Sequence, residues 1–294
     1  MTYEGHWIPA NFLGLPNGLS NRVSARFIVL PVPYDSTTSY KGGARHGPQA
    51  IIGASYNLEE YDADLDLDVS KLGIHTCPSL EPHFGGPQLM VERVYSTVKS
   101  LMDSERLVVM LGGEHSLTSG SVRAHKEVYP DLSVLYLDAH ADLRDQYMGT
   151  GWGHASAARR IFQLCPLVQV GVRSLSLPEK EFIEKEMVRT YYWPAEEDME
   201  SLVRSILGDL SPNVYVTVDL DVLDSSIMSA VGTPEPGGMG WRNLTFLLKR
   251  VAEEKCIVGC DIMELSPDEG PTACTFTAAK LAYRLMGCSE LKKK

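Results

Sequence analysis

The chain alternates short aliphatic and β-branched runs with longer amphipathic stretches over nearly its whole length, and this alternation limits its fold more than any other feature. The pattern is typical of βα units that build a mainly parallel sheet. The expected strands span residues 27–32, 107–111, 133–137, 167–172, 214–220 and 256–263. The expected helices lie near residues 88–102, 120–128, 154–162, 201–207, 241–252 and 277–285. We therefore expect an α/β fold.

The length of 294 residues and the 44% hydrophobic content are enough for one large buried core. Neither a Pro/Ser-rich linker nor an internal repeat divides the sequence. We expect a single domain over residues 1–294, with residues 1–25, which are irregular and rich in Pro, Gly and Asn, forming an N-terminal arm over it.

The charge balance argues against some classes of partner. Acidic residues outnumber basic ones by 38 to 27, giving a formal charge of −11, whereas nucleic-acid binding needs clustered Lys and Arg.

No window approaches ~18 uninterrupted apolar residues, and the first fifteen residues lack the pattern of a signal peptide. The six cysteines form no CxxC pair and are expected to be reduced thiols. We expect a cytoplasmic protein without nucleic-acid or membrane partners.

Polar residues with metal-binding chemistry follow three of the expected strands. VVML leads into GGEHS, SVLYL into DAHAD, and VYVTV into DLD. Open α/β sheets present their ligand sites at the carboxyl ends of parallel strands, so all three groups should gather at one edge. In an extended backbone alternate side chains share a face, which lets both DAHAD and DLD present their polar groups together. The candidate ligands are His115, Asp138, His140, Asp142, Asp219 and Asp221.

Four carboxylates at the end of a buried sheet would repel one another, and bound cations remove that penalty. Two divalent metal ions balance four negative charges. Six ligands are enough to hold two such metal ions roughly 3.5–4 Å apart. The oxygen-rich set with two imidazoles and no thiolate favours Mn²⁺, with other divalent ions as alternatives. A lone DxD is typical of a solvated turn, and a lone GEH of a capped helix start. Three such fragments in one βα chain predict a binuclear metallohydrolase.

With these motifs the sequence resembles the ureohydrolase family, which includes arginase, agmatinase, guanidinobutyrase and formimidoylglutamase. The matching segments are LGGEHS at 111–116, LDAHADLR at 137–144, VDLDVLD at 218–224, GTPEPGG at 232–238 and DIMELSP at 261–267. The resemblance implies a three-layer α/β/α, arginase-like fold with a central parallel sheet of about eight strands. Family members are usually trimers or hexamers, so it also implies a homo-oligomer.

The resemblance also implies roles for particular residues. The six candidate ligands match the positions that bind two Mn²⁺ ions, with Asp142 and Asp219 similar to the carboxylates that bridge the pair. The implied reaction is attack of a metal-bridging hydroxide on a guanidinium carbon, which releases urea and an amine.

Three further residues match family positions around the substrate. Glu264, in DIMELSP, resembles the glutamate that grips the guanidinium, a role that suits a carboxylate in bidentate geometry. His154 occupies the place of the proton-shuttling histidine, and histidine is well suited to that task near pH 7. Thr233 resembles a threonine that lines the pocket, although a turn role is also open. His46, in the agmatinase-type segment GGARHGP, could equally order its loop.

The substrate is predicted from departures within the family. The loop after the metal triplet lacks the polar set that arginases use for the arginine carboxylate, and GVRSLS, with Ser174 and Ser176, replaces a GLRDVD-like acidic segment. The sequence therefore favours agmatine, cleaved to putrescine and urea for polyamine biosynthesis. Asp145 and Tyr147 are candidate neighbours of the agmatine ammonium.

Other substrates and activities remain alternatives. HAS at 154–156 replaces the HGT of many agmatinases, which leaves guanidinobutyrate and aminopropylagmatine open. Arginine is disfavoured by the loop sequences, and Arg144 makes formimidoylglutamate conceivable. A catalytically silent binding homologue is opposed by the intact ligand set, and a bimetallic phosphoesterase by the missing GDxxD and GNHE motifs.

Overall fold

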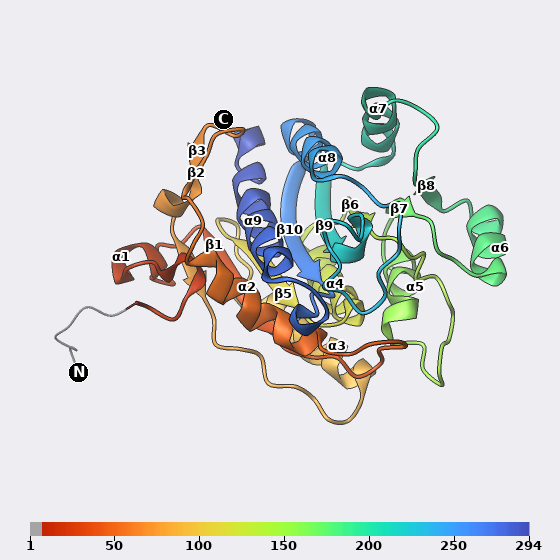
Figure 1. Cartoon of the computed structure of the whole chain (residues 1–294), viewed down its shortest axis with the longest axis horizontal. Coiled ribbons are helices and arrows are strands. Elements are labelled where there is room, and N and C mark those ends of the chain that lie inside the picture. Colours follow the sequence, from red (N-terminus) through yellow and green to blue (C-terminus); the bar gives the residue numbers. More distant parts are fainter. Residues whose placement is uncertain (1–7, 294) are drawn as a thin grey trace.

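A single sheet of eight parallel strands forms the centre of the molecule in the computed structural model, which describes residues 8–293 (Figure 1). Its strand order is β4-β1-β5-β10-β9-β6-β7-β8, and every neighbouring pair is parallel. The strands are β1 (Phe27–Val32), β4 (Ile74–Thr76), β5 (Leu107–Gly112), β6 (Leu132–Leu137), β7 (Leu167–Val172), β8 (Arg189–Tyr192), β9 (Asn213–Asp219) and β10 (Cys256–Met263). The predicted α/β class and the sheet of about eight strands are confirmed.

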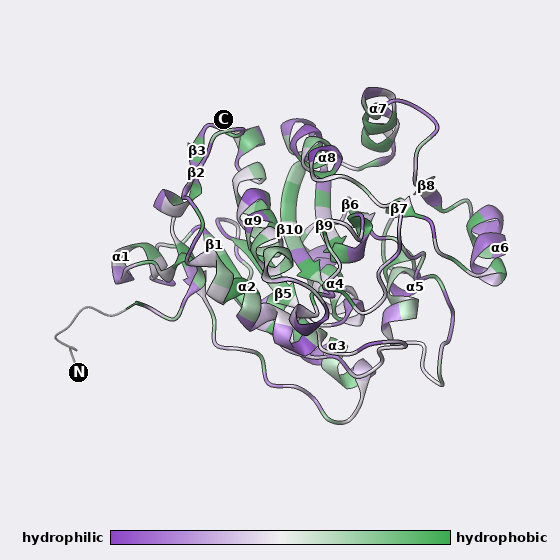
Figure 2. Cartoon of the chain, viewed as in Figure 1, coloured by the Kyte–Doolittle hydropathy of each residue, from purple (hydrophilic) through white to green (hydrophobic). Residues whose placement is uncertain are grey.

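The central strands form because their side chains are apolar on both faces, as a parallel sheet covered by helices requires. In β1, Phe27 and Val29 join one hydrophobic cluster, whereas Ile28, Leu30 and Val32 join another on the opposite face. Successive strand side chains point to opposite faces, so each strand contributes to both cores. Figure 2 shows the hydrophobic colour along β10, and polar colour on the outlying α6 (Leu177–Glu186).

Helices cover both faces of the sheet and complete three layers. On one face pack α2 (Gly47–Ser55), α7 (Met199–Asp209), α8 (Trp241–Glu254) and α9 (Thr272–Cys288). On the other pack α3 (Pro87–Leu101), α4 (Thr118–Val128), α5 (Ala157–Phe162) and α6. This arrangement leaves the carboxyl ends of the strands free to form a site.

Several short elements were not predicted from the sequence. They are the edge strands β4 and β8, the helices α1 (Asn17–Ser20), α2 and α6, and the small antiparallel pair of β2 (Tyr61–Asp62) and β3 (Leu67–Asp68). The helix expected from residue 154 begins at Ala157, because His154–Ser156 form a 3-10 turn. Edge strands are partly exposed and lack the apolar run that identifies a central strand, as the half-exposed β8 illustrates.

The expected N-terminal arm is described from residue 8 onward, and its first seven residues lie outside the described part of the chain. Phe12 is fully buried, and its backbone N–H donates to Thr76 Oγ1 at 2.9 Å. Leu13 N–H donates to Ser55 Oγ at 2.8 Å. Residues 8–25 therefore pack against β4 and α2. Among the described helices, none has both the length and the apolarity needed to cross a membrane.

Candidate metal centre and substrate pocket

Four neighbouring strands deliver the polar residues to one place. β5, β10, β9 and β6 are adjacent in the sheet, and their carboxyl ends meet at the same edge. His115 follows β5, Asp138 follows β6, Asp219 ends β9, and Glu264 follows β10. The sequence prediction that the three motifs gather along one edge is confirmed.

Each of three aspartates uses one carboxylate oxygen for a backbone hydrogen bond. Asp138 Oδ1 accepts from His140 N–H at 2.6 Å, and Asp219 Oδ1 accepts from Asp221 N–H at 3.0 Å. Asp221 Oδ1 accepts from Ala139 N–H, also at 3.0 Å. The backbone therefore fixes these side chains, and the Oδ2 atom of each remains available within the cluster.

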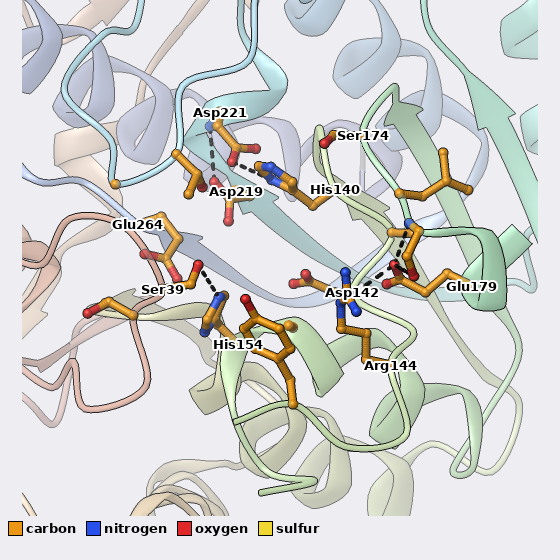
Figure 3. A pocket seen from close by; sticks show the side chains of 18 of the residues that line it. Ser39, His140, Asp142, Arg144, His154, Ser174, Glu179, Asp219, Asp221 and Glu264 are labelled. Atoms are coloured by element: carbon orange, nitrogen blue, oxygen red, sulfur yellow. Dashed lines mark hydrogen bonds and ion pairs between the residues drawn. The ribbon is translucent and has the colours of Figure 1, made fainter. Parts of the chain in front are cut away.

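The free oxygens surround two imidazole nitrogens and form two clusters. His115 Nδ1 lies 3.0 Å from Asp138 Oδ2 and 3.1 Å from Asp219 Oδ2. His140 Nδ1 lies 2.9 Å from Asp221 Oδ2 (Figure 3). It lies 3.6 Å from Asp138 Oδ1. Within each cluster the potential ligand atoms lie within 4.8 Å of one another. Two adjoining groups with the composition of metal sites result.

Asp138 belongs to both clusters, whereas Asp142 belongs to neither. Asp142 Oδ2 accepts from Tyr136 OH at 2.9 Å and lies 3.9 Å from His115 Nδ1, at the side of the first cluster. Its φ of +51° shows that the chain has left the extended conformation, so simple alternation does not bring it there. Among the described residues Asp138 holds the position that the two clusters share, and the bridging or spanning role that the resemblance implies for Asp142 and Asp219 stays a prediction.

The charge of the cluster fits divalent cations. Burial raises the pKa of Asp142, Asp219 and Asp221, and nearby carboxylates raise it further. Asp138 Oδ2 is buried without a hydrogen-bond partner. Burial opposes protonation of His115, but the carboxylates of Asp138 and Asp219, 3.0 and 3.1 Å from its Nδ1, raise its pKa well above the usual range. A cationic charge is thus favoured between the imidazoles and carboxylates, where these groups could hold a metal ion.

Buried groups behind the cluster orient His115. Its Nε2 lies 2.8 Å from Thr217 Oγ1, and its ring stacks on Tyr136 with centroids 4.4 Å apart. Sequence reasoning missed both residues. Thr217 stands two positions before Asp219 in β9, and Tyr136 two positions before Asp138, which follows β6, so period-two spacing was the signal that could have found them.

A cavity of about 240 Å³ opens above the clusters. Four candidate ligands line it, together with the three predicted residues His154, Thr233 and Glu264. Its described lining residues are Thr38, Ser39, Lys41, His140, Ala141, Asp142, Arg144, Tyr147, His154, Ala155, Ser174, Leu175, Ser176, Glu179, Asp219, Asp221, Gly232, Thr233 and Glu264. His115 and Asp138 lie beneath, almost fully buried.

Glu264 reaches this pocket through a strained backbone position. Its φ is +66°, and its Oε1 accepts from His115 N–H at 2.6 Å. Burial and the charge of Glu114 raise its pKa well above the usual range. A cationic group bound in the pocket would compensate that buried carboxylate, so the site is suited to a guanidinium.

His154 lines the same cavity and lies near Ser39, below Glu264 in the view of Figure 3. Its ring lies edge-on to Tyr147, with centroids 6.1 Å apart. Burial, and then the positive charge at His140, lower the pKa of His154 to about 4. At neutral pH the imidazole is therefore neutral and able to accept a proton.

Asp145 does not belong to this pocket. Its carboxylate forms an ion pair with Arg160 at 2.7 Å and is 69% exposed. Its neighbours Arg144 and Tyr147 line the cavity instead, with the Arg144 guanidinium 4.8 Å from the Tyr147 ring centroid. Because Asp145 pairs with Arg160 and is absent from the described lining of this cavity, we do not retain it as a substrate contact. His46 is exposed and does not line the cavity.

The fold and the site together define a class: an α/β protein with Asp/His clusters for metal beneath a pocket suited to a cation. Residues 25–288 match the model of the arginase family. An N(1)-aminopropylagmatine ureohydrolase of Thermus thermophilus is 39% identical over 275 residues, covering 91% of this chain and 92% of the relative. An agmatinase of Pyrococcus horikoshii is 37% identical, covering 90% and 92%.

A solved structure agrees. The agmatine ureohydrolase of Thermoplasma volcanium superposes with a TM-score of 0.86 at 28% identity, covering 98% of this chain and 96% of that chain. The chain belongs to the arginase family. It is a ureohydrolase, a hydrolase acting on guanidino C–N bonds, in a family of binuclear metal enzymes.

Proposed function

We propose that this chain hydrolyses agmatine to putrescine and urea with two Mn²⁺ ions. The ions would be held by His115, Asp138, His140, Asp142, Asp219 and Asp221. When bound, such ions act as Lewis acids that activate water near neutral pH. The oxygen-rich donor set with two imidazoles supports Mn²⁺.

The chain's own residues supply binding and proton transfer. Glu264 Oε1 is occupied by the His115 N–H, so Oε2 is the oxygen available to accept hydrogen bonds from the guanidinium. The neutral imidazole of His154 would take a proton released during water addition and return it to the departing amine nitrogen. Urea and a protonated amine are the products.

The choice of substrate rests on the cationic side chains that line the pocket, each of which lies close to a glutamate carboxylate. Among the described lining residues, Lys41 pairs with Glu269, and Arg144 Nε lies 3.8 Å from Glu179 Oε2. A carboxylate at the far end of a substrate would have to compete with Glu269 and Glu179 for these cations. This disfavours arginine, guanidinobutyrate and formimidoylglutamate, and it favours a guanidine with an amine tail.

N(1)-aminopropylagmatine is the second candidate, because the Thermus thermophilus relative at 39% identity carries that name. It shares the guanidine and the cationic tail but is longer. The same paired cations therefore support it as well.

The test measures product release from agmatine and N(1)-aminopropylagmatine. Arginine, guanidinobutyrate and formimidoylglutamate are tested in the same way. Urea is quantified for the guanidines and formamide for the last, with Mn²⁺ added and after metal stripping. We expect the highest kcat/KM with agmatine and no turnover without metal. Turnover of none of these compounds would refute the enzyme assignment, and preference for the longer amine would select the second candidate.

A further inference from the structure

Glu114 is a fully buried carboxylate that the proposed reaction does not use. Its Oε2 accepts from the backbone N–H groups of Ser36 and Thr37 at 2.6 and 2.7 Å. Its Oε1 accepts from Thr37 Oγ1 at 2.9 Å and from Ser116 Oγ at 2.6 Å. All four partners are donors, so Glu114 serves as an acceptor at both oxygens.

The Thr37 hydroxyl connects Glu114 to His154. Thr37 Oγ1 lies 3.1 Å from the His154 backbone nitrogen and 3.2 Å from its ring Nδ1. A hydroxyl has one proton, and Thr37 directs it to Glu114. Its oxygen can then only accept from His154. The backbone N–H is one donor, and Nδ1 must carry a proton to be the other.

The second ring nitrogen of His154 lies beside the Ser39 hydroxyl. Ser39 Oγ lies 3.3 Å from His154 Nε2, where it can donate to the lone pair (Figure 3). His154 lines the cavity, so the nitrogen not held by Thr37 is the one available to a substrate. The tautomer of a neutral histidine is set by the hydrogen bond that its other nitrogen makes.

We propose that Glu114 is a positioning residue that, through Thr37, holds His154 in the Nδ1–H tautomer, so that Nε2 is the atom that takes and returns the proton. The inference rests on the proposed function for the proton transfer, whereas the tautomer is a property of the free enzyme.

Glu114→Gln tests the direction of the hydrogen bonds. The amide oxygen can still accept from the two backbone N–H groups, which places its NH₂ group against Thr37 Oγ1 and Ser116 Oγ. Thr37 then accepts from Gln and directs its proton to Nδ1. We expect the His154 tautomer to invert to Nε2–H with little change in shape.

Three further variants distinguish an effect on the His154 tautomer from an effect of changed side-chain packing. Thr37→Val keeps the shape but removes the hydroxyl, so the preference for Nδ1–H should be lost. Thr37→Ser should restore it. Ser116→Ala removes a different donor to the same carboxylate and should retain Nδ1–H, which makes it the matched control.

The measurement is ¹⁵N NMR of ring-labelled histidine, with the His154 signals assigned by their absence in His154→Asn. In parallel, kcat and KM are measured with agmatine. For Glu114→Gln and Thr37→Val we expect kcat to fall roughly 10- to 100-fold, the usual cost of losing an orienting partner, with KM within about two-fold.

An Nδ1–H tautomer in both Glu114→Gln and Thr37→Val would overturn the proposal, as would a failure of Thr37→Ser to restore it. If Glu114→Gln does not fold, Thr37→Val decides alone. If wild type turns over none of the candidate substrates, the proposed function fails, while the tautomer of the free enzyme still tests the link between Glu114 and His154.

Discussion

At the scale of single residues, the cluster is organised by how each carboxylate divides its two oxygens. Asp138, Asp219 and Asp221 each give Oδ1 to a backbone N–H and leave Oδ2 within the cluster. Asp142 is held by Tyr136 OH. Because the side chains are fixed before an ion binds, little ordering is required at binding.

The Asp142→Ala variant should lose metal affinity and urea release together. Metal content after dialysis and kcat/KM report the two effects. The loss of affinity should at least match the roughly 10- to 100-fold cost of losing an outer-shell partner. Asp145→Ala is the control from the same loop, because Asp145 is exposed and lies outside the pocket. Full activity in Asp142→Ala would contradict the ligand assignment.

Glu264→Gln should weaken recognition of the guanidinium while keeping the loop in place. The amide oxygen can still accept from His115 N–H, so the contact at Oε1 survives. A hydrogen bond to a charged group contributes about 1.5–3 kcal/mol, so kcat/KM for agmatine should fall roughly 10- to 100-fold. Steady-state kinetics measure this, and an unchanged kcat/KM would show that Glu264 does not bind the guanidinium.

At the scale of elements, the turn after β5 brings the site together. A Cβ at Gly113 would lie 1.8 Å from the Tyr34 carbonyl oxygen, which also accepts from Glu114 N–H at 2.8 Å. The backbone after β1 thus approaches the GGEH turn more closely than any side chain permits. This contact sets the position of both Glu114 and His115.

Gly113→Ala should therefore strongly reduce the free energy of unfolding, by several kcal/mol as an order of magnitude for overpacking in a core. Gly53→Ala is the matched control, because Gly53 is exposed within α2 and a Cβ there meets nothing within 4 Å. It should instead stabilise the chain by about 0.5–1 kcal/mol. Urea unfolding of both variants measures the difference, and equal effects would refute the steric argument.

Buried strands were predicted from the sequence more accurately than exposed elements at the margin of the sheet. The ranges Phe27–Val32, Leu167–Val172 and Cys256–Met263 were predicted to the residue, because their apolar runs are covered on both faces. β8 and α6 were missed, since both lie at the margin and carry mixed polar sequences. α6 begins with a capping box of Ser176 and Glu179 that was visible in the sequence.

At the scale of the whole molecule, buried histidine makes stability depend on pH. His125 is fully buried, its Nε2 has no hydrogen-bond partner, and burial lowers its pKa to about 4. The unfolded chain binds this proton near pH 6.5, whereas the folded chain resists it until about pH 4. The free energy of unfolding should thus fall as the pH drops through that range, by roughly 3 kcal/mol for this residue.

The comparison with His125→Asn isolates this contribution. Asn can still donate to the Ser121 carbonyl, which lies 2.8 Å from His125 Nδ1, but it does not titrate. The variant should be less stable near pH 7.5 because of the smaller side chain, and the gap to wild type should narrow towards pH 4. Parallel stability curves from chemical unfolding at each pH would contradict this prediction.

The sequence alone determined the α/β class, the central strands and the six candidate residues of the metal centre, because each motif directly follows an apolar strand and parallel strands end at one edge of a sheet. Only the tertiary structure decided which carboxylate is shared. Asp138 rather than Asp142 is common to the two clusters, and Asp142 itself has a left-handed backbone with a φ of +51°. It also directed Asp145 outward and joined Glu114 to His154 through Thr37, contacts between distant segments that no local pattern encodes.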